Sequence, residues 1–209
     1  MSVRTSELPT VPTRLDDMDR NIAAGTRLWA GATTFFFLGP FFAFLYLRSL
    51  NTGGMWRPPH VDPPRSLGAT IMVLVVAAAI AVVLASRVAD SARDRAWKPL
   101  VAVALVLGLA AVLLQGIEYA RLGFGPTDGG YASVFVTWTG LNALFVLGTT
   151  LWTETLLAYG LRTRRQASTP ADDPDSPPAL IHPRLAALAF YWTYLAGLGV
   201  VMWAVLYLV

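Results

Sequence analysis

The sequence contains no cysteine and only two histidines, His60 and His182. Without cysteine there is no disulfide framework, no thiolate metal site and no redox-active thiol. Haem and copper inside a membrane protein are generally held by histidine, methionine or cysteine, and neither histidine lies in an apolar stretch. We interpret the isolated Met72 and Met202 as packing residues, so the sequence predicts no catalytic centre, no metal and no cofactor in this chain.

Charged residues are also scarce. They make up 14% of the chain, whereas hydrophobic residues make up 55%, and soluble domains carry about 25% charged residues. The net charge of +3 does not indicate nucleic-acid binding, because the basic residues cluster in polar segments rather than on one face. The composition therefore predicts an integral membrane protein.

Five apolar segments interrupt the polar parts of the chain. At about 1.5 Å per residue, each is long enough to cross a hydrocarbon core of about 30 Å. We predict an all-α fold, a polytopic membrane bundle of five transmembrane helices within residues 27–209, preceded by a cytoplasmic tail at residues 1–26 that is no cleaved signal peptide. The predicted spans cover residues 28–50, 67–86, 100–119, 133–161 and 185–208.

Basic residues are distributed unequally between the two sides that five spans define. The N-terminal tail and the segments near residues 90 and 170 share one side, and twelve of the sixteen basic residues fall there. Because cytoplasmic loops carry the excess of Lys and Arg, we predict the N-terminus inside and the C-terminus outside.

Glu118 is the most unfavourable side chain within the predicted spans, because a carboxylate in hydrocarbon costs about 2.5–3.5 kcal/mol. Two interpretations compete: Glu118 is a functional intramembrane acid, or it extends to the outer surface at a helix end. Gln115 lies one turn earlier on the same helix face, so an i,i+3 hydrogen bond is available. We predict that contact, with Tyr119 pointing elsewhere.

Asn142 and Glu154 are the other candidate polar residues within the spans. Glu154 falls in the inner third of the membrane and Glu118 at the outer end, so the two carboxyl groups are not expected to form one site. His60 and Asp62 share a proline-rich segment, but two candidate ligands make a weak metal site.

Several motifs occur in an order that resembles subunit III of the haem-copper respiratory oxidases, the cytochrome c and quinol oxidases, in its divergent five-helix form. No single motif is specific, but their order and spacing together are. They are the aromatic run FFFLGPFFAFLYLRS, the loop Trp56-Arg57-Pro58-Pro59, the pattern Gln115-x-x-Glu118-Tyr119, the helix start with Tyr131, Ser133, Phe135 and Thr139-Gly140, and Tyr191-Trp192 with Trp203.

The chain departs from that family at several polar positions. Thr33 stands near the place where the family has Glu, and Asn142, Phe145 and Thr193 stand where it has His. Any role that depends on those side chains is therefore in question. A divergent member of this kind is also compatible with another oxidase class, or with a related complex such as a nitric-oxide reductase.

The resemblance implies a non-redox accessory subunit of a terminal haem-copper oxidase in a bacterial cell membrane. Such a subunit packs against catalytic subunit I and the other subunits of the respiratory complex, binds phospholipids, and supports the stability and proton uptake of its partner, which holds the haem and copper. Two alternatives remain open: a stand-alone or reductase-associated assembly or stabilising protein, and a small transporter that uses Glu154 or Glu118.

The distribution of polar residues also predicts a grouping of the helices. The first two spans carry the least polar surface, so we expect them to separate from the last three across a lipid-filled cleft, as the resemblance implies. Arg27 and Arg87 are candidate contacts for lipid head groups, or else ordinary positive-inside anchors. Within the group of the last three spans, small residues are expected to let the helices pack closely. These residues, which we call the small-residue seam, are Gly108, Gly140, Ala143 and Gly148.

Overall fold

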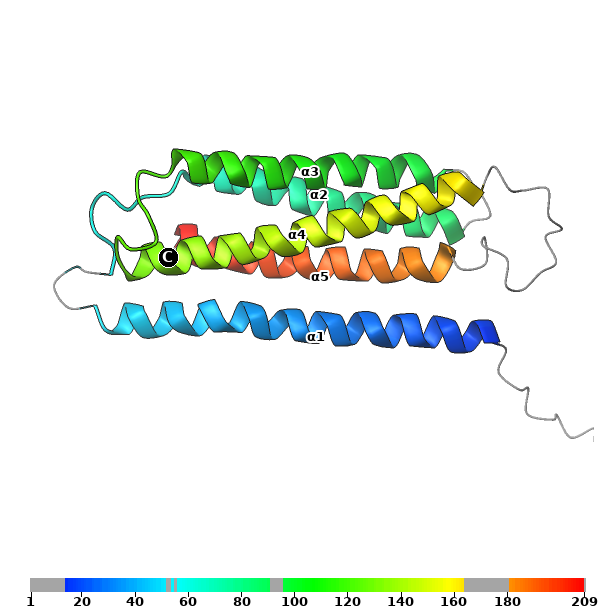
Figure 1. Cartoon of the computed structure of the whole chain (residues 1–209), viewed down its shortest axis with the longest axis horizontal. Helices are drawn as coiled ribbons and strands as arrows, with labels where there is room; N and C mark the ends of the chain where they lie inside the picture. Colours follow the sequence, from blue (N-terminus) through cyan, green and yellow to red (C-terminus); the bar gives the residue numbers. More distant parts are fainter. Residues whose placement is uncertain (1–13, 52–53, 55, 91–95, 164–180, 209) are drawn as a thin grey trace, which may run out of the picture.

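The structure is a computed structural model that describes residues 14–51, 54, 56–90, 96–163 and 181–208. Its five helices run lengthwise beside one another (Figure 1). All five helices of the described residues are long enough and apolar enough to cross a membrane, which confirms the all-α prediction and is consistent with five membrane spans. They are α1 (Arg14–Ser49), α2 (Arg65–Asp90), α3 (Trp97–Arg121), α4 (Gly130–Thr163) and α5 (Ile181–Leu208).

The helices are longer than the apolar segments that predicted them. The α1 helix begins at Arg14, so the second half of the segment predicted as a polar tail is helical and continuous with the first span. Arg20 and Asp17 form an exposed ion pair at 2.6 Å on this extension. The apolar part of a sequence indicates only the part of a helix that can lie in the hydrocarbon core. It therefore underestimates the length of a helix that extends beyond the membrane.

The packing of the helices differs from the predicted grouping. The α2 helix packs most extensively against α3 and α5, whereas α1 packs against α4 and α5. In Figure 1, α1 lies along one edge of the bundle, and α2 and α3 lie at the opposite edge. This corrects the expectation that the first two spans form one group with a cleft between them and the other three. The number of polar residues on a helix does not decide which helices it packs against. Small residues such as alanine and glycine let two helix backbones approach closely, and their positions are independent of polar content.

The predicted small-residue seam is present in part. A Cβ at Gly108 would lie 2.4 Å from the Thr150 hydroxyl oxygen, so α3 and α4 approach closely at this point. Gly140 faces Tyr119, whose hydroxyl would lie 3.2 Å from an added Cβ. Nothing lies within 4 Å of such a Cβ at Gly148, which corrects its assignment to the seam.

The α1 helix is attached to the bundle by few contacts. Only 22% of its most apolar stretch is buried within the chain, compared with 56% for α5. The Thr33 hydroxyl forms a hydrogen bond with the Tyr191 hydroxyl at 2.8 Å, and Thr34 pairs in the same way with Tyr194. Because each pair joins a side chain of α1 to one of α5, these hydrogen bonds set the position of α1 along the axis of α5.

Candidate functional site

Glu118 is fully buried near the end of α3. The Gln115 side-chain amide donates to Glu118 Oε2 at 2.6 Å, which confirms the predicted i,i+3 contact. The Tyr207 hydroxyl donates to the other carboxyl oxygen, Oε1, at 2.6 Å. Each carboxyl oxygen therefore has a donor inside the bundle. Because Glu118 has no exposed surface, the interpretation in which it extends to the outer surface is wrong.

Tyr207 is the functional neighbour that sequence reasoning missed. It lies in the last turns of α5 and is only 3% exposed. Its ring stacks on Trp203 with centroids 6.0 Å apart and meets the ring of Phe135 edge-on at 5.5 Å. Its separation of 89 residues from Glu118 left no local pattern that could have paired them.

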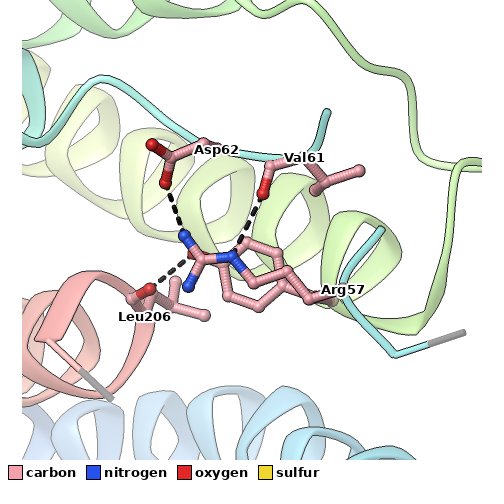
Figure 2. Close-up of polar contacts among 5 residues, drawn as sticks. Arg57, Val61, Asp62 and Leu206 are labelled. Atoms are coloured by element: carbon pink, nitrogen blue, oxygen red, sulfur yellow. Dashed lines mark hydrogen bonds and ion pairs between the residues drawn. The ribbon is translucent and has the colours of Figure 1, made fainter. Parts of the chain in front are cut away.

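A second polar layer lies between this site and the loop that follows α1. The Tyr131 hydroxyl donates to the carbonyl of Leu206, the residue before Tyr207. The Arg57 guanidinium lies over the Tyr131 ring at 4.6 Å from its centroid. Arg57 also donates to the Val61 carbonyl at 3.1 Å and pairs with Asp62 at 2.6 Å (Figure 2). The loop is therefore held against Tyr131 at the start of α4, and Tyr131 joins this point to the end of α5, where Leu206 precedes Tyr207.

Tyr119 points away from Glu118, as predicted. Its hydroxyl bonds to the Thr139 hydroxyl at 2.7 Å and donates to the Val136 carbonyl at 3.2 Å. Tyr119 consequently joins α3 to α4, and it forms a contact that is separate from the pairing of Glu118 with α5.

Asn142 and Glu154 have opposite surroundings. Asn142 is 1% exposed, and its Oδ1 has no hydrogen-bond partner among the residues that the structure describes. It lies where α2, α4 and α5 meet, because a Cβ at Gly199 would lie 3.3 Å from Asn142 Oδ1 and 3.2 Å from Met72 Sδ. Glu154 is exposed and takes no part in the hydrogen bonds of Glu118.

The described part of the chain holds no group of three or more His, Cys, Asp and Glu residues that could bind a metal ion. One oxygen of the Asp62 carboxylate, Oδ1, is paired with the Arg57 guanidinium at 2.6 Å. Several buried polar residues instead form hydrogen bonds between helices, as Tyr207 does with Glu118 and Thr33 with Tyr191.

Arg27 and Arg87 are both exposed, and each lines a hollow between two helices. Arg87 lies in a hollow of about 450 Å³ between α2 and α5, which shares Val76, Ile80 and Val200 with a second, fully apolar hollow of about 400 Å³. We call these two hollows together the α2/α5 groove. Arg27 shares a hollow of about 320 Å³ between α1 and α5 with Asp19.

These features define a class: a multi-pass helical membrane protein in which several buried polar groups, Glu118 and Thr33 among them, join helices to one another. Residues 15–167 match the family model described as cytochrome c oxidase subunit III. The chain therefore belongs to the cytochrome c oxidase subunit III family. The matched region covers α1 to α4, and α5 lies beyond it.

Individual relatives give the same result. The cytochrome c oxidase subunit 3 of Oryctolagus cuniculus is 28% identical over 146 residues, which are 67% of this chain and 56% of the relative. That of Struthio camelus is 29% identical over 147 residues, again 67% and 56%. That of Formosania lacustris is 30% identical over 136 residues, 62% and 52%. The aligned region thus spans little more than half the length of these relatives.

Proposed function

We propose that this chain is a non-redox accessory subunit of a terminal haem-copper oxidase. The observation that carries the proposal is the family match over residues 15–167, supported by a polar interior whose contacts are used for packing. Its partners would be catalytic subunit I and the other subunits of the complex, and they would hold the haem and copper. Its role would be to stabilise the catalytic subunit and support its proton uptake.

Co-purification tests this proposal. The tagged chain, isolated in mild detergent from the membrane of its own organism, should carry partner subunits with the visible absorption of haem. The same chain stripped of its partners should show no haem absorption and no stoichiometric copper. Purification without any haem protein would contradict the proposal and favour a stand-alone or transporter role.

We propose a topology with the N-terminus in the cytoplasm and the C-terminus outside. The ends of α1, α2, α3 and α5 that carry Ser49, Arg65, Arg121 and Leu208 would then face the outside, and the Glu118 site would lie near that surface. A reporter that is active only outside the cytoplasm, fused after Val209, should be active. A cytoplasmic reporter active at the same position would contradict this topology.

The exposed face of α1 is the best candidate for the partner interface. Small and large residues alternate on it at heptad spacing, the arrangement by which transmembrane helices interlock at crossing angles of about +20°. No atom lies within 4 Å of a Cβ added at Gly25 or Gly39, so these gaps are open. The small residues are Gly25, Ala32 and Gly39, and the large ones are Leu28 (76% exposed), Phe35 (77%) and Phe42 (60%).

A pair of glycines tests that interface. Gly39→Leu fills a gap on the α1 face and should lower the haem that co-purifies with the tagged chain. Gly148→Leu is the matched control, because Gly148 is exposed on α4 and nothing lies near it either. Equal haem recovery with both variants would remove α1 as the partner interface.

The α2/α5 groove supports phospholipid binding. Its walls are apolar, and Arg87 lies at its predicted cytoplasmic end, where a basic residue near an anionic head group contributes about 1 kcal/mol. Arg87 is a better candidate than Arg27, because Asp19 shares the hollow of Arg27 and repels a phosphate. Arg87→Gln should reduce the anionic lipid that co-purifies. Arg121→Gln should not, because Arg121 lies at the predicted outer end of α3 and does not line the groove. Unchanged lipid content would leave Arg87 with only a role in topology.

Glu118 would serve this function by holding α3 to α5 rather than by carrying protons. Both of its carboxyl oxygens accept hydrogen bonds inside the bundle, and a glutamine keeps the shape and most of that bonding. Glu118→Gln should therefore leave assembly and turnover of the complex nearly unchanged. Reduced turnover with normal assembly would instead assign proton handling to Glu118.

A further inference from the structure

The backbone of α2 touches the end of the Tyr207 ring at Gly68. A Cβ added to Gly68 would lie 2.4 Å from Tyr207 Cζ and 2.6 Å from both Cε1 and the hydroxyl oxygen. Real Cβ atoms essentially never approach other heavy atoms this closely. Glycine is therefore the residue that allows Tyr207 to occupy its observed position.

The position of Tyr207 matters because its hydroxyl is one of the two donors to Glu118, at 2.6 Å. The ring has little freedom to move aside. Trp203 stacks against it and Phe135 meets it edge-on, and the whole residue is 3% exposed. A side chain at position 68 would push against the ring tip, and a displaced tip would carry the hydroxyl away from Glu118.

We propose that Gly68 is the positioning residue of the Glu118 site. Among the described residues, no side chain of α2 hydrogen-bonds to Glu118; α2 instead contributes a gap into which the tip of Tyr207 fits. Three helices then form the site together: α3 supplies Glu118 and Gln115, α5 supplies Tyr207, and α2 holds Tyr207 in place. The extensive packing of α2 against both α3 and α5 agrees with this arrangement.

This inference concerns contacts inside the chain and does not rest on a role in an oxidase. It is tested on the purified chain in detergent, so its failure is distinguishable from a failure of the proposed function. The measured quantity is the energetic coupling between the Tyr207 hydroxyl and Glu118, obtained from the unfolding equilibrium constants of Tyr207→Phe, Glu118→Leu and the double variant.

The coupling should depend on the residue at position 68. Hydrogen bonds between membrane helices average about 0.6 kcal/mol and reach about 1.7 kcal/mol, so the coupling should change the unfolding constant about three- to twentyfold. In a Gly68→Ala background it should fall below about twofold. Gly116→Ala is the control, because Gly116 lies two residues from Glu118 but has nothing near its added Cβ; it should leave the coupling intact. Coupling of unchanged size in Gly68→Ala would overturn the proposal.

A rescue experiment covers the case in which Gly68→Ala does not fold. Tyr207→Leu removes the ring atoms that the new methyl group meets, so Gly68→Ala in that background should fold and match the stability of Tyr207→Leu alone. If the double variant is clearly less stable than Tyr207→Leu alone, or if it fails to fold, Gly68 acts on something other than Tyr207 and the proposal is overturned.

Discussion

Helices α1 and α5 are both long, apolar and close to an end of the chain, yet their most apolar stretches are 22% and 56% buried. The α5 helix contacts α1, α2 and α4, α2 most extensively, and it carries Tyr207, which completes the Glu118 site. The α1 helix contacts α4 and α5 and directs a row of large side chains outward. Two helices of similar hydropathy therefore differ in packing: α5 holds the bundle together, whereas α1 exposes a face of large side chains.

The largest effect is expected at the tightly packed contact between α3 and α4, in contrast to the loosely attached α1. Gly108→Ala would place a Cβ 2.4 Å from the Thr150 hydroxyl oxygen and 3.2 Å from the Trp192 ring. Overpacking of this kind costs about 1–3 kcal/mol, which should appear as a lower free energy of unfolding in detergent. The control is Gly116→Ala on the same helix, where no atom is near. Equal stability of the two variants would contradict the close approach of α3 and α4.

An intermediate effect is expected where α1 is attached to α5. Thr33→Val and Tyr191→Phe each remove one hydroxyl of a buried pair, and membrane double-mutant cycles average about 0.6 kcal/mol for such pairs. The two changes together should destabilise the chain by less than the sum of the single changes. Thr70→Val is the control, because Thr70 bonds only within its own helix and is exposed. Strict additivity would show that the Thr33 contact does not hold α1.

The smallest effect is expected at Asn142, and its sign is informative. Its Oδ1 has no partner among the described residues, and replacing such a buried polar group with an apolar one of similar shape is nearly neutral or stabilising. Asn142→Leu should therefore leave stability unchanged or raise it by up to about 1 kcal/mol. Thr139→Val, which breaks a bond to Tyr119, should lower it. A clear loss of stability in Asn142→Leu would show that Asn142 has a partner.

The sequence was sufficient to predict the helices and the local half of the Glu118 site. Apolar segments of this length indicate candidate transmembrane helices, and the contact between Gln115 and Glu118 follows from helix periodicity alone. The family resemblance likewise rested on short motifs whose order along the chain can be seen in the sequence itself.

The non-local half of the site was beyond the reach of those rules. Tyr207 on α5 meets Glu118 on α3 where α2 packs against both helices, and the proposed role of Gly68 depends on its having no side chain. The helix pairing was predicted incorrectly for the same reason: polar content suggested that α1 and α2 belong together, whereas α2 packs mainly against α3 and α5. Which helices become neighbours depends on the fit of their surfaces, and hydropathy does not encode that fit.

Site-specific photocrosslinking tests the central claim, that the bundle is a haem-free subunit whose α1 face meets a haem-bearing partner. A photoreactive residue at Phe35, 77% exposed on α1, should capture a haem-containing catalytic subunit in intact membranes, whereas the same group at Val106, 64% exposed on the aliphatic face of α3, should capture mainly lipid. Capture of the haem protein from Val106 and not from Phe35 would contradict the assignment of the interface to α1. Failure to capture a haem protein from either position would contradict the subunit role itself.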